Sequence, residues 1–280
     1  MQTPRLSAHI ESYRYPDGTI ALEDIRLDIY QGEFCGILGA NGSGKSTLLK
    51  LLDGIIKAGS GRILLDGTDI TRLTPKKIYS KIGLVFQNPD DQLFAHSVFE
   101  DVAFGPRNMG CLEPDVRQRV EQALLAVEMQ ETAAKDIHHL SYGQKKRVCI
   151  AGLLAMGHEI LLMDEPTAGL DPIGEYRMME LLARLNRESG VTIVMATHSI
   201  DLVPLFLTKL HVLCKGRHLL SGTPEKVFRS GDELYDLKLR LPYVAELLDK
   251  LRTCDQLPVK RLPLSVEAAR QELLHLLKSC

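Results

Sequence analysis

The chain opens with alternating apolar and polar positions and then changes to continuous apolar runs. Residues 6–15 and 20–30 alternate as antiparallel strands with one wet face do, and residues 16–19 form a turn between them. Residues 34–38 are an apolar run of strand length, and residues 46–52 have helical periodicity. This pattern predicts a hairpin, then a buried strand, then a helix.

The middle of the chain is predicted to be helical. Short strands at residues 63–65 and 82–86 flank a helical stretch at residues 75–79. No strand pattern is present in residues 89–156, where helical periodicity recurs at residues 97–104, 114–127 and 141–154. These helices are expected to form an insert between two strands of one sheet.

Strands and helices alternate again after the insert. Apolar strands at residues 160–163 and 191–196 flank an amphipathic helix at residues 172–188, which favours a mostly parallel sheet covered on both faces. Residues 210–214 and 218–220 predict a final hairpin. The predicted class is α/β, with a nucleotide-binding domain over residues 1–222 that includes the helical insert.

Residues 223–280 are leucine-rich and are predicted to form a helical C-terminal extension. Ser265 is placed to cap the last helix, which carries Leu273, Leu274, Leu276 and Leu277. Leucine on several helical faces predicts burial, either against the chain's own domain or against a second subunit. The extension is therefore a candidate dimerisation region.

Residues 39–46, with the sequence GANGSGKS, match the phosphate loop G-x-x-x-x-G-K-[S/T] at every fixed position. Glycines let the backbone approach phosphate oxygens, and the N–H groups of the following helix point at them. Lys45 supplies a positive charge, and Ser46 a hydroxyl for Mg²⁺. The strand before the motif and the helix after it make a chance glycine-rich turn the weaker explanation.

Three predicted strand ends carry polar side chains. Gln87, Asp164-Glu165 and His198 each follow a strand of the predicted sheet, and ligands of open α/β sheets bind at the carboxyl ends of strands. Asp164 is placed to hold Mg²⁺ and Glu165 to polarise an attacking water. Gln87 can reach that water or the metal, and His198 the γ-phosphate. A single Gln or His at the end of a strand is usually only a polar residue that caps the strand. Here three strand ends bring polar side chains to the same edge of the sheet, which favours a functional site.

Two further features have functional and structural readings. Ser141-x-x-Gln144 is a capping box, which predicts the start of a helix. The N-terminus of this helix can bind an anion. Because it is far in sequence from the phosphate loop, which has its own helix, we expect it to serve the nucleotide of another subunit. Tyr15 precedes the loop at a spacing suited to stacking on adenine. It is equally well read as an ordinary tyrosine at the end of a strand.

Composition excludes several classes of protein. With 34 Lys+Arg against 36 Asp+Glu, the net charge is -2 and no basic run suggests nucleic acid. Six scattered cysteines predict reduced thiols of a cytosolic protein. No apolar run approaches the roughly 18 residues of a membrane span. We therefore expect that the chain does not insert into lipid. If it acts at a membrane, partner proteins must hold it there.

Together these motifs, with residues 169–171, resemble the ATP-binding cassette (ABC) ATPases over about residues 6–230. The resemblance implies a P-loop NTPase core with an antiparallel β subdomain, an inserted helical subdomain at about residues 89–156, and the helical extension. It implies ATP and Mg²⁺ as cofactors, and two cassettes closing face to face over two ATPs. Tyr142 departs from the family pattern, which has glycine there.

The resemblance also assigns roles residue by residue. Glu165 is the implied catalytic base, acting with Gln87 and His198, and Mg²⁺ is assigned to Ser46, Gln87 and Asp164. The implied ATP-binding residues come from both subunits: Tyr15, Gly39, Ala40, Asn41, Gly42, Ser43, Gly44, Lys45, Ser46, Thr47, Ser141, Gly143, Gln144 and Asp171.

Residues 86–94 and 144–148 are most similar to the ATPases of energy-coupling factor importers, and residues 196–204 to their cobalt branch. The resemblance implies a peripheral ATPase on the cytoplasmic face of the cell membrane. Its implied partners are a second copy, a membrane coupling subunit and substrate-binding membrane subunits. Nickel and vitamin importers are the alternatives. A soluble ABC ATPase of DNA repair or translation is disfavoured, because the chain has one cassette, no zinc module and no basic face.

Overall fold

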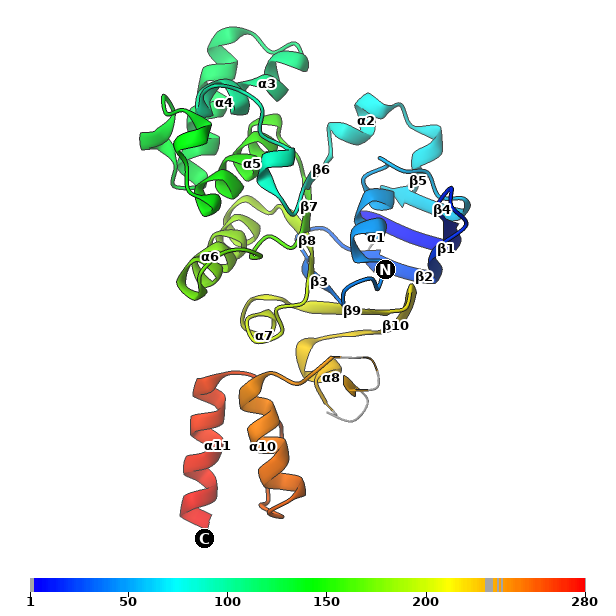
Figure 1. Cartoon of the computed structure of the whole chain (residues 1–280), viewed down its shortest axis with the longest axis vertical. Coiled ribbons are helices and arrows are strands. Elements are labelled where there is room, and N and C mark those ends of the chain that lie inside the picture. Colours follow the sequence, from blue (N-terminus) through cyan, green and yellow to red (C-terminus); the bar gives the residue numbers. More distant parts are fainter. Residues whose placement is uncertain (1–2, 230–233, 236, 238, 280) are drawn as a thin grey trace.

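A six-stranded sheet runs through the middle of the protein (Figure 1). The computed structural model describes residues 3–229, 234–235, 237 and 239–279. The strand order is β10-β9-β3-β8-β7-β6, parallel except for the edge strand β10. The strands are β3 (Phe34–Leu38), β6 (Ile82–Val85), β7 (Ile160–Asp164), β8 (Thr192–Thr197), β9 (Lys209–Cys214) and β10 (Arg217–Gly222). The predicted parallel sheet and closing hairpin are confirmed.

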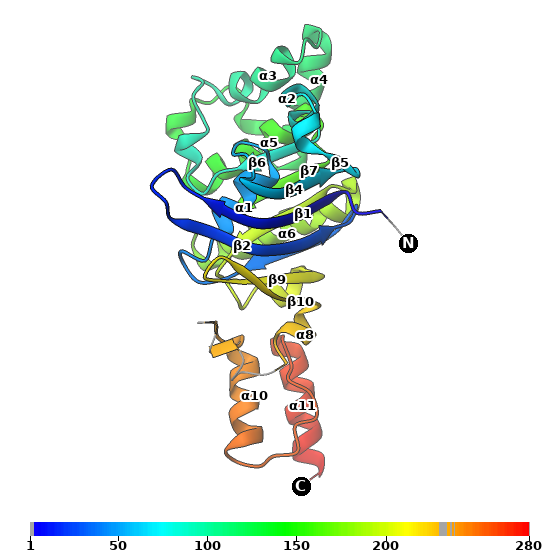
Figure 2. The ribbon, with the colours of Figure 1, turned by 90° about the vertical axis from the view of Figure 1, so that its right-hand side faces the viewer.

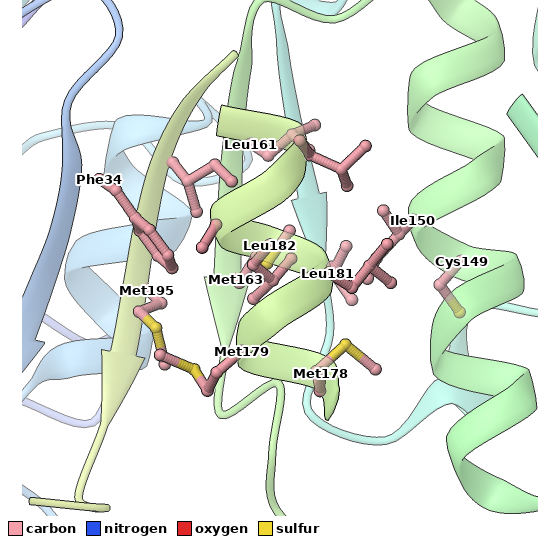
Figure 3. Close-up of a cluster of buried hydrophobic side chains, with 14 of the residues drawn as sticks. Phe34, Cys149, Ile150, Leu161, Met163, Met178, Met179, Leu181, Leu182 and Met195 are labelled. Atoms are coloured by element: carbon pink, nitrogen blue, oxygen red, sulfur yellow. The ribbon is translucent and has the colours of Figure 1, made fainter. Parts of the chain in front are cut away.

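The central strands are buried along their whole length because both faces of the sheet are covered. On one face, α6 (Pro172–Ser189) brings Met178, Met179, Leu181 and Leu182 against Phe34, Leu161, Met163 and Met195 of the sheet, with Cys149 and Ile150 behind them (Figure 3). On the other face, α1 (Lys45–Leu52) lies in a second core. This second core fixes the helix that follows the phosphate loop.

An antiparallel sheet packs over α1 (Figure 2). Its order is β2-β1-β4-β5, with β1 (Leu6–Arg14), β2 (Ile20–Ile29), β4 (Ser60–Leu65) and β5 (Thr68–Asp69). The predicted first hairpin is confirmed, with Leu6 opposite Ile29. The pairing of β4 with β1 was not predicted. The strand also begins earlier than expected, at Ser60.

The predicted helices of the insert are confirmed as α3 (Val98–Asn108), α4 (Glu113–Ala126) and α5 (Tyr142–Met156), which lie together at one end of the protein (Figure 1). Ser97 and Ser141 cap α3 and α5 through their side chains. The remaining short helices are η1 (Ile70–Arg72), α2 (Pro75–Tyr79), η2 (Pro89–Asp91), η3 (Gln130–Thr132), η4 (Ile137–His139), α7 (Val203–Phe206) and α8 (Pro224–Val227).

In the described part of the C-terminal extension, the long helices are α10 (Tyr243–Thr253) and α11 (Val266–Ser279), which lie at the end opposite the insert (Figure 1). The hydroxyl of Ser265 accepts a hydrogen bond from Ala268 N, as the predicted cap requires. Leu248 and Leu276 belong to a small separate core. Leu277 is 75% exposed, so the leucines of α11 are only partly buried by their own chain.

The extension contacts the main domain at the start of α10. The guanidinium of Arg240 pairs with Asp201, whose Oδ1 also accepts a hydrogen bond from Tyr243 N at 2.9 Å. The Arg240 guanidinium lies 3.8 Å from the centre of the Tyr243 ring. Across the residues that the structure describes, no helix combines the length and apolar character needed to cross a membrane.

Candidate nucleotide-binding site

The loop between β3 and α1 is packed closely at two glycines, where a side chain would meet neighbouring atoms. Gly44, the residue before α1, has φ +98°, and a Cβ there would lie 2.6 Å from Leu22 Cδ2. A Cβ on Gly39 would lie 2.3 Å from Ser43 Oγ. The glycines therefore allow the loop to pack against both β2 and itself, which leaves the N–H groups at the start of α1 available to an anion.

Lys45 is the buried cation of this loop, with 6% of its surface exposed. Its Nζ donates to the carbonyls of Gly39, at 2.8 Å, and Ala40, at 3.3 Å, and lies 3.8 Å from Glu165 Oε1. Burial lowers the pKa of Lys45, and the carboxylates of Glu165 and Asp164 oppose that shift. The amine is thus placed in the phosphate loop, where it could donate a hydrogen bond to a bound phosphate group.

Adjacent strand ends bring the predicted polar residues together, as expected. Gln87, Glu165 and His198 line one cleft of about 710 Å³ with the phosphate loop. Nδ1 of His198 lies 2.8 Å from Glu165 Oε2, although this contact is not aligned as a hydrogen bond. Glu165 is 6% exposed and has φ +50°. A left-handed non-glycine residue costs about 1–3 kcal/mol, and such strain is typical of functional sites.

Asp164 lies at the end of β7 beside the loop. Burial raises the pKa of its carboxyl group, while a hydrogen bond from Ser46 opposes that rise. Its Oδ1 is buried and has no hydrogen-bond partner among the described residues. A buried carboxylate oxygen of this kind, next to a serine hydroxyl, suits a hard cation such as Mg²⁺.

Tyr15 lines the cleft together with Thr19, Ile20 and Ala21 of the first hairpin. Its hydroxyl is 2.8 Å from Thr47 Oγ1, and its ring packs edge-on against Tyr13 at 5.3 Å. The hydrogen bond ties the end of β1 to the first turn of α1. Tyr15 therefore forms part of the cleft wall with Asn41 and Thr47, while its stacking on adenine stays a prediction.

Most of the predicted phosphate-loop residues line this cleft with Tyr15 and Thr47, but Gly39, Ala40, Ser141, Gly143, Gln144 and Asp171 do not. The carbonyls of Gly39 and Ala40 accept from Lys45, as described above. Ser141 caps α5 with both halves of the capping box formed, because Gln144 Oε1 accepts from Ser141 N at 3.0 Å. Asp171 caps α6 by accepting from Gly174 N at 2.6 Å. With Gly143, these caps form a second group of residues that the chain does not use in its own cleft.

The sequence analysis missed part of the cleft wall. Lys215 and Gly216, from the turn between β9 and β10, reach the cleft, and Gly216 N donates to Ser43 O at 3.1 Å. Thr19, Ile20 and Ala21 contribute from the first hairpin. The predicted strand at residues 210–214 could have indicated Lys215 and Gly216. This strand, β9, is parallel to β3 and pairs with it, so the residues after β9 lie beside the phosphate loop.

Comparison with known proteins agrees with this geometry. The ABC transporter family model matches residues 22–168. A putative ABC transporter ATP-binding protein of Geobacter sulfurreducens is 64% identical over 98% of this chain and 99% of its own length. The energy-coupling factor transporter ATP-binding protein EcfA of Methanocaldococcus jannaschii is 46% identical over 89% of each chain.

Solved structures are similar as well. The structure of cbiO1 from Clostridium perfringens, described as part of the ABC transporter complex cbiONQ, has a TM-score of 0.78 and 44% identity, and covers 89% of this chain and all of that one. A dimeric ATP-binding cassette bound to ADP and Pi has a TM-score of 0.69 and 29% identity, and covers 78% of this chain and 98% of its own.

The fold and the phosphate-loop cleft define a P-loop ATPase, and the chain belongs to the ABC transporter ATP-binding family. It hydrolyses ATP, as the cassettes of this family do. More particularly, it is the ATP-binding subunit of an ABC transporter of the energy-coupling factor type.

Proposed function

We propose that two copies of this chain close face to face over ATP, so that each completes the other's nucleotide site. The cleft contains the N-terminus of α1, whereas the capped N-terminus of α5 lies outside it. The N-terminus of a helix attracts phosphate through its N–H groups and the helix dipole. The similar cassette that is dimeric with ADP and Pi supports a dimer here. In such a dimer, Ser141, Gly143, Gln144 and Asp171 would face the partner's nucleotide.

Glu165 is the proposed catalytic base. Its buried carboxylate stands at the rim of the cleft, between Lys45 and His198. In this role it takes the proton of the attacking water, while Lys45 and the loop N–H groups hold the phosphates. His198 orients the carboxylate and senses the terminal phosphate. Gln87 senses the nucleotide state from the end of β6.

Mg²⁺ is the proposed cofactor, with Ser46, Gln87 and Asp164 as the residues that hold it. All three offer side-chain oxygens, the atoms that Mg²⁺ prefers, and the unpartnered Oδ1 of Asp164 fits such an ion. Bound there, Mg²⁺ would neutralise charge on the β- and γ-phosphates.

The cargo we propose is a transition metal ion that crosses the membrane through separate subunits. Cobalt is the first candidate for this ion, and nickel is the alternative. The observation that carries this proposal is the similarity over 89% of the chain to cbiO1, a part of the cbiONQ complex. A vitamin importer is the second candidate, because relatives named only for the energy-coupling factor class are similar to the same degree. In either case, the ATPase would be a peripheral protein on the cytoplasmic face of the membrane.

The segment of residues 88–94 is proposed to contact a helix of the membrane coupling subunit. Phe94 is 64% exposed, and its ring packs edge-on against that of Phe104 at 4.7 Å. Exposed aromatic side chains are enriched at interfaces between proteins. The segment that contains Phe94 follows Gln87, which lines the nucleotide cleft. Binding of a membrane subunit to this segment would therefore act on a residue of the nucleotide site.

The C-terminal extension is proposed to help join the two copies. Leu247 on α10 and Leu277 on α11 are 54% and 75% exposed, beside a small core that their own chain already fills. Covering these side chains in a dimer would contribute favourable apolar burial.

The test of the transport proposal is a pull-down of the tagged full-length chain from native membranes in mild detergent, with all partners identified. One constant set of membrane subunits that includes a metal-binding protein would support the metal importer. Several alternative small membrane proteins on a common coupling subunit would support the vitamin importer instead. Recovery of only soluble or nucleic-acid partners would contradict transport, while leaving the ATPase activity intact.

A further inference from the structure

Lys146 is a buried cation that none of the roles above employs. It lies in α5, five residues after the cap Ser141, and only 1% of its surface is exposed. Its Nζ donates to the backbone carbonyl of Glu165 at 2.9 Å. Helix α5 is thereby hydrogen-bonded directly to the proposed base of the same chain, at the residue whose backbone is left-handed.

Tyr142 makes a second connection from the same turn of α5. Its hydroxyl donates to the backbone carbonyl of Gln87 at 3.2 Å, and its ring lies 5.2 Å from Lys146 Nζ. The ring also packs against Gly169, where an added Cβ would come within 2.8 Å of Tyr142 Cε1. One turn of α5 thus contacts the segments that follow β6 and β7 and the segment that leads into α6.

We propose that Lys146 and Tyr142 are positioning residues that couple α5 to the hydrolytic residues of the same chain. The proposal rests on the proposed role of Glu165 and on the contact of Ser141 with the partner's nucleotide. When that contact draws α5 towards the partner, Lys146 and Tyr142 shift the backbone of Glu165 and Gln87 with it. ATP in one site thereby prepares the base of the other.

Stability does not account for a lysine at this place. Burying an ammonium group carries a desolvation cost that a methionine of similar length would avoid. The face of Tyr142, one neutral carbonyl and the nearby carboxylates of Glu165 and Asp164 offset only part of that cost, since burial still lowers the pKa of Lys146 to about 8. What the ammonium adds is a directed hydrogen bond to Glu165, whose strained backbone needs its surroundings to hold it in place.

The test uses the purified full-length dimer and the variants Lys146→Met and Tyr142→Phe. Lys146→Met is expected to lower kcat for ATP hydrolysis about tenfold, as befits loss of one hydrogen bond from a charged donor. The Kd for ATP should stay within about twofold, and Tm should be equal or higher, because the buried charge is gone. Tyr142→Phe keeps the ring and should lower kcat by a few fold, since it loses one neutral hydrogen bond.

Lys145→Met is the matched control, since Lys145 lies on the same helix but its Nζ pairs with Asp90 instead. It is expected to keep the normal kcat. Coupling is measured by combining Ser141→Ala with Lys146→Met. If Lys146 transmits the effect of Ser141, the double variant turns over at about the rate of the slower single variant.

Two results would overturn the proposal. Normal kcat in both Lys146→Met and Tyr142→Phe would show that neither contact positions the base. Multiplicative effects of Ser141→Ala and Lys146→Met would show that the two residues act independently. Failure of the proposed function looks different: Glu165→Gln would then hydrolyse ATP normally, and the coupling proposal would fall with it.

Discussion

Asp53 is a carboxylic acid in an unfavourable place, at the end of the helix that carries the phosphate loop. It is the C-cap residue of α1, is 4% exposed, and its Oδ1 has no hydrogen-bond partner among the described residues. Burial raises the pKa of this carboxyl group from 3.8 to about 7. The negative end of the helix dipole also disfavours the charged form. Folding therefore prefers Asp53 protonated.

The size of this effect follows from the difference between the folded and unfolded pKa values. Stability from the neutral carboxyl is fully present below pH 3.8 and is lost as the pH rises to about 7. Each pH unit in this window costs about 1.4 kcal/mol. Between pH 5 and pH 8, two units lie in the window, so Asp53 lowers the free energy of unfolding by about 3 kcal/mol.

Asp53→Asn removes this loss, because asparagine has the shape of the protonated acid and does not titrate. We expect the stability difference between the variant and the natural protein, measured by urea unfolding, to grow by about 3 kcal/mol from pH 5 to pH 8. Asp115→Asn, an exposed position on α4, serves as the control and should show no such growth. A difference for Asp53→Asn that stays constant with pH would refute the reasoning.

Two further predictions concern hydrolysis and assembly. Glu165→Gln should reduce ATP turnover by at least about a hundredfold while ATP still binds, which traps a closed dimer visible by size-exclusion chromatography; normal turnover would remove Glu165 as the base. Leu247→Ser combined with Leu277→Ser should lower the dimer fraction in ultracentrifugation without changing ATP binding by the core. The exposed Leu125→Ser on α4 is its control, and an unchanged dimer would show that the extension does not join the copies.

Local patterns predicted most of the elements that position the site. The phosphate loop could be predicted because its glycines, lysine and flanking strand and helix are contiguous in sequence. Gln87, Glu165 and His198 could be placed on one rim because parallel strands end at the same edge of a sheet. Both inferences need only the type of each element, which periodicity reveals.

Pairings between distant segments could not be predicted in the same way. The strand pattern before Leu65 says nothing of its partner β1, since many registers bury the same apolar face. The contacts of Lys146 with Glu165 and of Tyr142 with Gln87 depend on how the helical insert sits on the sheet. The sequence placed both residues in a capped helix and marked Tyr142 as a departure from the family pattern, but it did not show what either side chain contacts.

The order of strands in the main sheet has a consequence for how the protein is synthesised. β3 is made early, but both of its neighbours come late: Phe34 pairs with Ile193 of β8, and Leu38 with Val212 of β9. The phosphate loop that follows β3 therefore emerges from the ribosome long before the cleft walls that contain Glu165, His198 and Lys215 exist. Until the chain has been made as far as Cys214, at least one edge of β3 lacks its hydrogen-bonding partner and its apolar faces lack part of their cover, a state that favours chaperone capture and misfolding.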